Sequence, residues 1–296
     1  MVQQSTVTTI LNGFGLSLGD GIIGVQALSA ARALGLIRGR VVLGRREPPE
    51  KPLVPQLYGL IGDLAEVMPL ENAPRGGRLI DIRDFAFDPR FASVSMIDFF
   101  LARLDILPDR VPASLKRNRW LAERRPVLPA PPLPAGYVLL CPRASIALRD
   151  MPEEIETAIL ERLAAQRIGP VVTQGRALMG AIAAPWLSRI EDLCSLVAGA
   201  RAIISTDTAI LHLADAFDVP CLGFFTTHRP EWRVRDYPHC MAVHLPAPGL
   251  PESIEFIRGK DDIRAARAAW FPQGPDLGWL TRALDQFGTF AGIPGA

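Results

Sequence analysis

Two successive rounds of strand-like and helix-like segments, separated by a run of prolines, constrain this chain more than any other feature. In the first round, β-branched and apolar residues at 7–11 predict a strand, and a glycine-rich turn follows at 12–21. Apolar residues at helical spacing over 22–34 predict a helix that stops at Gly35. A second strand is expected at 40–43. This order is typical of the beginning of a doubly wound parallel sheet.

The proline run marks a domain boundary. Five prolines stand within the nine residues 126–134, where they cannot continue a helix or a central strand, so a stiff linker is expected. After it the alternation restarts, with strands expected at 137–141, 170–173, 202–205 and 220–225 and helices at 153–166, 190–198 and 210–217. The chain of 296 residues is long enough for two domains at roughly 100–200 residues each.

The expected fold class is therefore α/β, with two Rossmann-like β/α domains facing each other across a cleft. In this class ligands bind beyond the carboxyl ends of the strands. The predicted parts are an N-terminal domain (1–126), a proline-rich linker (127–135), a C-terminal domain (136–275) and a C-terminal helical segment that packs back toward the first domain (276–296).

Composition and charge narrow the partners. The net charge of +1 gives no drive toward nucleic acid, and no nucleic-acid partner is expected. Four cysteines without CxxC spacing, and an N-terminus unlike a signal peptide, favour a cytoplasmic protein. The basic stretch 116–125 has two interpretations. It is a solvated surface, or it contacts an acidic substrate or anionic lipid, which implies a peripheral place at the inner face of the inner membrane.

The first glycine-rich turn resembles a dinucleotide-binding fingerprint, although its spacing is GxGxxxG. Gly13, Gly15 and Gly19 form the pattern, and Arg45 and Arg46 follow the next strand, where a 2′-phosphate would be met. An NADP-dependent oxidoreductase is therefore one alternative. A turn that merely closes strand onto helix is another.

Residues 16–23, with the sequence LSLGDGII, resemble the N-terminal motif of the heptosyltransferase-like enzymes, glycosyltransferase family nine of the GT-B fold. The resemblance implies that Asp20 faces the interdomain cleft as the general base. An inverting transfer needs a carboxylate to take the proton of the acceptor hydroxyl as the glycosidic bond forms. The alternative is that Asp20 only caps the helix.

A second stretch, residues 200–214 (ARAIISTDTAILHLA), resembles the same family's S-N-D-T-G-x-x-H-L-A signature. Two positions depart from it: Thr206 stands for Asn and Ala209 for Gly. Because glycine permits closer backbone approach than alanine, Ala209 would change how closely a phosphate approaches the backbone at this position.

The signature implies a donor site built from four residues. Thr208 and Ala209 open a helix whose free N–H groups and dipole suit a diphosphate, whereas Asp207 would hold sugar hydroxyls. His212 lies four residues after Thr208 and therefore on the same helix face. If this motif is considered alone, the alternatives are that Asp207 or Thr208 caps the helix and that His212 is a core histidine.

Two shorter matches add donor-side candidates. Residues 142–145 resemble the family's P-G-A-S, which places Ser145 at the donor and Arg143 where the family has Gly. Residues 149–152 resemble K-x-W-P, so Arg149 would neutralise the departing diphosphate. Arg143 is either a second phosphate contact or a surface residue.

The loop at 226–230 resembles a family loop that would bring Thr227 and Arg229 near the donor. His239, Cys240 and His244 lack an acidic or CxxC partner, so no metal site is expected. The resemblance likewise implies no metal and no cofactor.

The resulting hypothesis is an inverting, metal-independent glycosyltransferase. It would move a heptose-like sugar from a nucleotide-diphosphate donor, such as ADP-heptose, to a glycan, lipopolysaccharide-core (lipid-linked) or protein acceptor. Beside the oxidoreductase, a degenerate GT-B protein that binds a nucleotide or a partner without turnover stays open, because Thr206, Ala209 and Arg149 depart from the family pattern.

Overall fold

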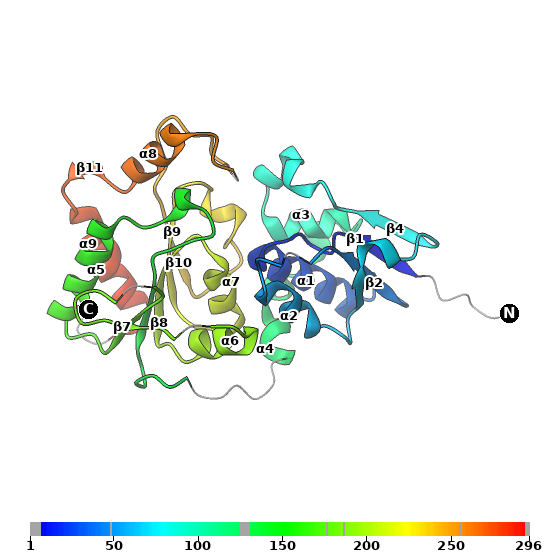
Figure 1. Ribbon diagram of the computed structural model, residues 1–296, viewed down its shortest axis with the longest axis horizontal. Coiled ribbons are helices and arrows are strands. Elements are labelled where there is room, and N and C mark those ends of the chain that lie inside the picture. Colours follow the sequence, from blue (N-terminus) through cyan, green and yellow to red (C-terminus); the bar gives the residue numbers. More distant parts are fainter. Residues whose placement is uncertain are drawn as a thin grey trace. The chain divides into compact units, whose positions relative to one another are not determined.

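The computed structural model describes residues 7–47, 49–124, 131–175, 177–185, 187–254 and 256–293, and the chain divides into two compact units (Figure 1). The first unit comprises residues 1–128 with 188–191, and the second comprises 129–187 with 192–296. The division after residue 128 falls within the predicted linker, of which residues 127–130 lie outside the described residues. Each unit is a β/α structure with a parallel sheet, which confirms the predicted fold class.

The first unit contains a four-stranded parallel sheet in the order β3-β2-β1-β4. Its strands are β1 (Thr8–Leu11), β2 (Val41–Arg45), β3 (Glu66–Pro69) and β4 (Arg78–Asp81). From β1 the chain adds β2 and β3 on one side and then β4 on the other. The strand order therefore reverses between β1 and β4, which is where open α/β sheets place their ligands.

Helix α1 (Leu18–Ala33) is the central helix of this unit and contacts α2 (Leu53–Gly59), α3 (Met96–Arg103) and α4 (Arg119–Arg124). It begins four residues earlier than its apolar spacing predicts, because the Ser17 side chain accepts a hydrogen bond from the Asp20 N–H and caps the first turn. The short 3₁₀ helices are η1 (Leu70–Asn72), η2 (Phe85–Phe87), η3 (Pro89–Ala92), η4 (Pro108–Arg110) and η5 (Ala113–Lys116).

The second unit contains a six-stranded parallel sheet in the order β10-β9-β8-β5-β6-β7. The strands are β5 (Val138–Cys141), β6 (Val171–Thr173), β7 (Ile182–Ala183), β8 (Ala202–Thr206), β9 (Cys221–Phe225) and β10 (Cys240–His244). A further short strand, β11 (Pro272–Pro275), lies outside this sheet. Here the order reverses between β5 and β8.

Helices cover both faces of the second sheet (Figure 1). On one face, α5 (Glu153–Ala165) and α9 (Gly278–Phe290) share a core with β5, β8 and β9. On the other, α7 (Ala209–Ala216) packs Leu211 against Gly223 of β9. The remaining helices are α6 (Ile190–Ala198), α8 (Lys260–Ala269), η6 (Ala147–Arg149) and η7 (Pro230–Trp232).

The apolar face of α9 is used inside the second unit. That residues 276–296 also pack back toward the first domain stays a prediction. Leu280, Leu284 and Phe287 are buried in the same core as α5, and Arg162 of α5 forms an ion pair with Asp285. Among the described residues, no helix is both long and apolar enough to cross a bilayer.

Candidate functional site

Three neighbouring strands of the second unit deliver polar residues to one edge of the sheet. Arg149 ends η6 in the loop after β5, Asp207 follows β8 directly, and Thr227 and His228 follow β9. Since β9, β8 and β5 are adjacent and parallel, their carboxyl ends lie side by side. The sheet thereby brings these side chains together at its topological switch point.

Asp207 lies at the centre of this group and is only 3% exposed. Its Oδ2 atom is 3.1 Å from Nδ1 of His228 and 3.7 Å from Nε of Arg149. Because a carboxylate only accepts hydrogen bonds, the contact with His228 places the ring proton on Nδ1. Thr227 Oγ1 lies 3.0 Å from the same ring nitrogen.

The charges around Asp207 keep it ionised. Burial raises the pKa of a carboxyl group, but Arg149, His228 and Arg233 outweigh that effect and hold the pKa of Asp207 well below its usual range. Arg233 is itself buried. The cluster is therefore a buried anion surrounded by basic side chains, two of which are permanently charged arginines.

The start of α7 follows the predicted pattern. Thr208 is the N-cap, and its Oγ1 accepts a hydrogen bond from the Ile210 N–H at 3.2 Å and lies 3.1 Å from Ser205 Oγ. Ala209 is the first residue of the helix. Thr206, which stands for the family's Asn, is buried, and its Oγ1 has no hydrogen-bond partner within the described ranges.

His212 lies inside the helix and not at its open end. The ring is buried, and Nδ1 is 2.9 Å from the Tyr237 hydroxyl. Burial, together with the positive charges of Arg233 and Arg149, lowers the pKa of His212 to about 4, against the opposing charge of Asp207. At neutral pH the ring is uncharged, as expected for a core histidine; its donor-binding role stays a prediction.

The loop after β5, which carries Arg149, is held by one hydrogen bond within the loop and one from the residue after β9. Asp150 Oδ1 accepts from the Ala144 N–H at 2.8 Å, and Thr226 Oγ1 donates to the Leu148 carbonyl at 3.0 Å. Ser145 is exposed on this loop. A contact of Ser145 with the donor stays a prediction.

Arg143 is exposed, as expected for a surface residue. It donates to the Met151 carbonyl at 2.6 Å and to Glu156 of α5 at 3.1 Å, and these bonds tie the loop to α5. A phosphate contact of Arg143 stays a prediction.

Two members of the cluster, His228 and Arg233, are not predicted by the sequence motifs. His228 follows Thr227 after the end of β9, a buried strand beside β8. A polar residue directly after a buried strand is the signal in the sequence that points to His228. Arg233 lies beyond η7 and carried no motif. Arg229, which was placed near the donor, is exposed and forms an ion pair with Glu252.

In the first unit, Asp20 lies in the first turn of α1. Ser17, and not Asp20, is the N-cap, with the Asp20 N–H donating to Ser17 Oγ at 3.1 Å. Asp20 is therefore not the N-cap, and its role as the base stays a prediction. Its carboxylate lies beside Gly15, where a Cβ atom would be 3.2 Å from Asp20 Oδ2 and 2.8 Å from the Phe85 ring after β4.

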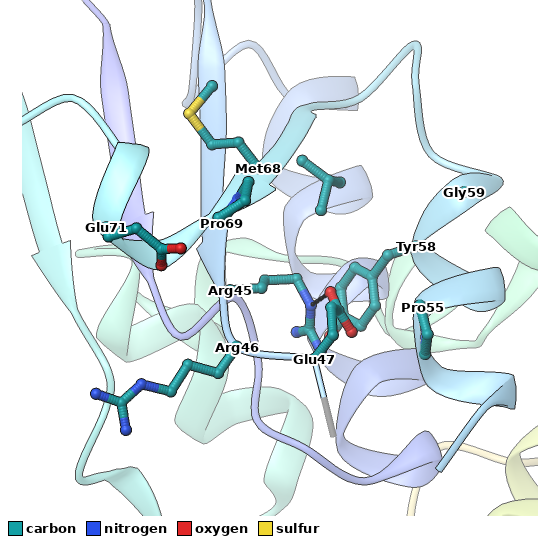
Figure 2. A pocket seen from close by; sticks show the side chains of 10 residues that line it. Arg45, Arg46, Glu47, Pro55, Tyr58, Gly59, Met68, Pro69 and Glu71 are labelled. Carbon is teal, nitrogen blue, oxygen red and sulfur yellow. Dashed lines mark hydrogen bonds and ion pairs between the residues drawn. The ribbon is translucent and has the colours of Figure 1, made fainter. Parts of the chain in front are cut away.

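Arg45, a candidate for a 2′-phosphate, is engaged within the fold. The side chain is 2% exposed; it donates to the Gly13 carbonyl, pairs with Glu47 at 3.1 Å and lies 3.5 Å above the centre of the Tyr58 ring (Figure 2). Arg46 points away from Arg45 and is exposed (Figure 2). These contacts engage Arg45 within the fold, whereas Arg46 is left exposed, so the dinucleotide alternative stays open through Arg46.

The basic stretch 116–125 is also partly engaged. Lys116 is buried and forms an ion pair with Asp98 at 2.7 Å, and Arg124 pairs with Asp63 at 2.8 Å. Two of the basic side chains in this stretch therefore form ion pairs within the first unit.

Within the described part of the chain, no group of three or more His, Cys, Asp or Glu side chains is placed to hold a metal ion.

Comparison with known proteins places these features in a family context. Residues 144–239 match the sequence model of glycosyltransferase family 9 (heptosyltransferase). No curated protein matches the sequence. Among solved structures, the heptosyltransferase TibC of enterotoxigenic E. coli, in complex with ADP-D-β-D-heptose, is similar over 97% of this chain and 77% of its own, with a TM-score of 0.60 and 12% identity.

Two further E. coli structures are similar over almost their whole length. Heptosyltransferase WaaC with ADP-2-deoxy-2-fluoro heptose gives a TM-score of 0.55 at 16% identity, covering 95% of this chain and 98% of its own. ADP-heptose lipopolysaccharide heptosyltransferase II gives 0.54 at 12% identity with the same coverage. At these identities the likeness establishes the fold.

Fold and family segment together define the class: a glycosyltransferase of the GT-B fold. Within that class, the chain resembles glycosyltransferase family 9, the heptosyltransferases. The matched segment contains Arg149, Asp207 and Thr227, the donor-side residues of the second unit. The resemblance predicted from the motifs is thereby confirmed.

Proposed function

We propose that this chain is an inverting, metal-independent glycosyltransferase that moves a heptose-like sugar from a nucleoside diphosphate to a glycan, lipopolysaccharide-core or protein acceptor. The observation that carries the proposal is the meeting of Arg149 and Asp207 at the start of α7, beside the carboxyl ends of β5 and β8, where the strand order reverses. The ADP-heptose compounds held by structures of the same fold support an ADP-sugar as donor. We place the reaction in the cytoplasm.

In this proposal the donor diphosphate binds at the N-terminus of α7. The Ala209 N–H at the start of the helix, and the positive end of the helix dipole, favour a dianionic group there. Arg149 turns from Asp207 toward the phosphates, and Ser145 and Thr227 supply hydroxyl hydrogen bonds. Asp207 meets the sugar, because a carboxylate repels a diphosphate.

The reaction is a single displacement with proton transfer. The acceptor oxygen forms a bond to the anomeric carbon while the bond from that carbon to the phosphate oxygen breaks. Asp20 of the first unit takes the hydroxyl proton as the glycosidic bond forms. The nucleoside diphosphate leaves with the bonding electron pair, and Arg149 and the positive end of the α7 dipole neutralise its charge. His228 and Arg233 continue to hold Asp207 when Arg149 engages the phosphates.

Calorimetric titration with ADP and with an intact ADP-sugar tests the donor roles. Arg149→Ala should weaken both ligands, because both carry the diphosphate that Arg149 contacts. Asp207→Asn should weaken the ADP-sugar and leave ADP binding intact, because only the sugar meets the carboxylate. Asn keeps the shape of the side chain in its buried position.

Arg143→Ala is the matched control, since Arg143 lies on the same loop and contacts Met151 and Glu156. It should leave the affinity for both ligands close to that of the wild type. Equal losses of ADP and ADP-sugar in Asp207→Asn would mean that Asp207 only shapes the start of α7. Donor binding without any transfer to a panel of acceptors would instead support the degenerate, binding-only alternative.

A further inference from the structure

His228 is fully buried at the edge of the second sheet, between two residues to which the proposed function gives different roles. Its Nδ1 atom lies 3.1 Å from Asp207 Oδ2 and 3.0 Å from Oγ1 of Thr227, its neighbour along the chain. In the proposed function Asp207 meets the sugar, and Thr227 gives a hydroxyl to the diphosphate. One ring nitrogen is therefore in contact with both parts of the proposed donor site.

The proton on Nδ1 decides which hydrogen bonds the two neighbours can make. Because Asp207 is ionised, an unprotonated Nδ1 would turn its lone pair against the carboxylate, so this nitrogen carries a proton and donates to Oδ2. A protonated Nδ1 has no lone pair, and Thr227 therefore cannot donate to it. Instead the Thr227 oxygen accepts from the same N–H in a three-centre hydrogen bond.

The hydroxyl proton of Thr227 is then left for another acceptor. The residue is only 2% exposed, and within the described part of the chain its Oγ1 atom forms no hydrogen bond other than the one with His228. Buried polar groups in folded proteins nearly always find a partner, so this O–H is oriented to donate to a bound ligand. A phosphate oxygen, which only accepts hydrogen bonds, is the matching ligand atom.

We propose that His228 is a positioning residue for the sugar-nucleotide donor: its Nδ1–H makes the Thr227 hydroxyl a hydrogen-bond donor to the diphosphate and holds the Asp207 carboxylate as an acceptor for the sugar. The inference rests on the proposed function, which gives Thr227 and Asp207 their ligands. It adds the group that fixes the direction of both hydrogen bonds. The site then discriminates in favour of a phosphate acceptor beside Thr227 and a hydroxyl donor beside Asp207.

The protonation of the ring is the first test, because a purely space-filling role for His228 does not require a proton on Nδ1. ¹⁵N NMR of histidine-labelled protein reports the protonation of each ring nitrogen. The signals that disappear in His228→Asn identify this ring among the four histidines of the chain. We expect Nδ1 of His228 to carry a proton at pH 7, and an unprotonated Nδ1 overturns the inference.

Calorimetric titration with ADP tests the contact through Thr227. Leu removes the N–H of His228 and keeps an apolar side chain of similar size, whereas Asn places an amide N–H close to the position of Nδ1. Thr227→Val and His228→Leu should each weaken ADP by about tenfold, the effect of one hydrogen bond to a charged group. His228→Asn should bind ADP within about twofold of the wild type, and an Asn variant as weak as the Leu variant overturns the inference.

The double variant of Thr227→Val with His228→Leu shows whether the two residues act together. It should bind ADP as weakly as Thr227→Val alone, because the hydroxyl that His228 orients is already absent. Losses that multiply to about a hundredfold would mean that His228→Leu disturbs the site in another way, and they overturn the inference. Thermal melting checks that each variant is folded. If His228→Leu does not fold, His228→Gln replaces it, since its amide reaches the position of Nε2 and not that of Nδ1.

Titration with an ADP-sugar separates this inference from the proposed function. His228→Leu should weaken the ADP-sugar more than ADP, because Asp207 also loses its partner, whereas His244→Leu, a control on the exposed side of β10, should bind both ligands as the wild type does. Wild-type affinities in His228→Leu refute the role of His228 and leave the proposed function standing. A wild type that binds neither ligand refutes the proposed function, and the role of His228 is withdrawn with it.

Discussion

Asp207 is a buried carboxylate with several basic partners, and in the proposed function one of them, Arg149, is available to bind the donor diphosphate. The carboxylate is surrounded by His228, Arg149 and Arg233, so it does not depend on one partner. Removing one member of a buried ion pair usually costs about 3–5 kcal/mol, since the other charge is left uncompensated. With His228 and Arg233 as further partners, Arg149 can move toward a diphosphate while Asp207 remains paired.

At Asp20, a catalytic role and a structural role predict opposite results. We expect Asp20→Asn to cut turnover by about 10²–10⁴-fold, because the amide cannot take the acceptor proton. Its stability should change little, since Ser17 is the cap. Ser17→Ala should lower the free energy of unfolding by about 1 kcal/mol instead. Steady-state kinetics and urea unfolding measure the two effects, and full turnover in folded Asp20→Asn would exclude the base.

His212 should make the fold sensitive to acid. Its pKa is about 4 in the folded chain against an ordinary value of 6.5, so the unfolded chain binds a proton first as the pH falls. The stability that a neutral His212 gives is present above pH 6.5 and is lost between about pH 6.5 and 4. The loss is roughly 3 kcal/mol.

Urea unfolding from pH 7.5 to pH 4 measures this contribution as a difference between variants. His212→Gln keeps a polar group near Tyr237 but does not titrate, so its stability should fall less steeply over that range. His244→Gln is the control, because His244 is exposed. Identical slopes for wild type and His212→Gln would show that His212 does not control the acid response.

At the scale of the element, the turn from β1 into α1 is built from unusual backbone. Asn12, Gly13, Phe14 and Gly15 all have positive φ, a region that costs most residues energy. The Phe14 ring is fully buried and packs edge-on against Phe100 at 5.4 Å between ring centres. Burial of this ring anchors the turn, and the turn leads into the first turn of α1, which holds Asp20.

Gly24 of α1 should be sensitive to a single methyl group. A Cβ atom there would lie 2.1 Å from Phe14 Cγ, too close for any real contact. Alanine is normally better than glycine inside a helix by about 1 kcal/mol. We nevertheless expect Gly24→Ala to destabilise the chain by about 1–3 kcal/mol, because Phe14 must move.

Chemical denaturation of Gly24→Ala beside Gly62→Ala tests this packing. Gly62 has no atom within 4 Å of an added Cβ, so the control should be neutral or more stable by up to about 1 kcal/mol. A Gly24→Ala variant as stable as the control would mean that the Phe14 ring does not press on α1 as described.

At the scale of the whole molecule, the proposed function takes the positive potential for a diphosphate from the protein itself. In that proposal Arg149, Arg233 and the N-terminus of α7 provide it in the second unit. We therefore expect the transfer rate to be unchanged after dialysis against EDTA and after re-addition of Mg²⁺. Initial-rate measurements check this, and a rate that falls with EDTA and recovers with Mg²⁺ would refute metal independence.

Ligand-induced stabilisation separates the glycosyltransferase from the oxidoreductase. A ligand at 100 times its dissociation constant raises the free energy of unfolding by about 2.7 kcal/mol. ADP should raise the melting temperature. The fluorescence of NADPH should not change when the protein is added, because Arg45 is engaged with Gly13, Glu47 and Tyr58. Tight NADPH binding without a response to ADP would favour the oxidoreductase.

The sequence by itself determined the α/β class, the restart of the alternation after the proline run, and the candidates Asp20, Arg149, Asp207 and Thr208. These follow from local information. Apolar periodicity and turn chemistry act over a few residues, so strands and helices at 137–225 could be predicted close to their bounds. The family motifs are likewise short, contiguous stretches.

Only the tertiary structure decided which partners those residues have. Arg45 is a basic residue after a strand in the sequence, but in the fold it is buried against Tyr58. His228 and Arg233 complete the environment of Asp207 from loops that no local pattern connects. The physical reason is that burial and ion pairing depend on residues that are distant along the chain and meet only when the strands pair, so their energies have no local signature.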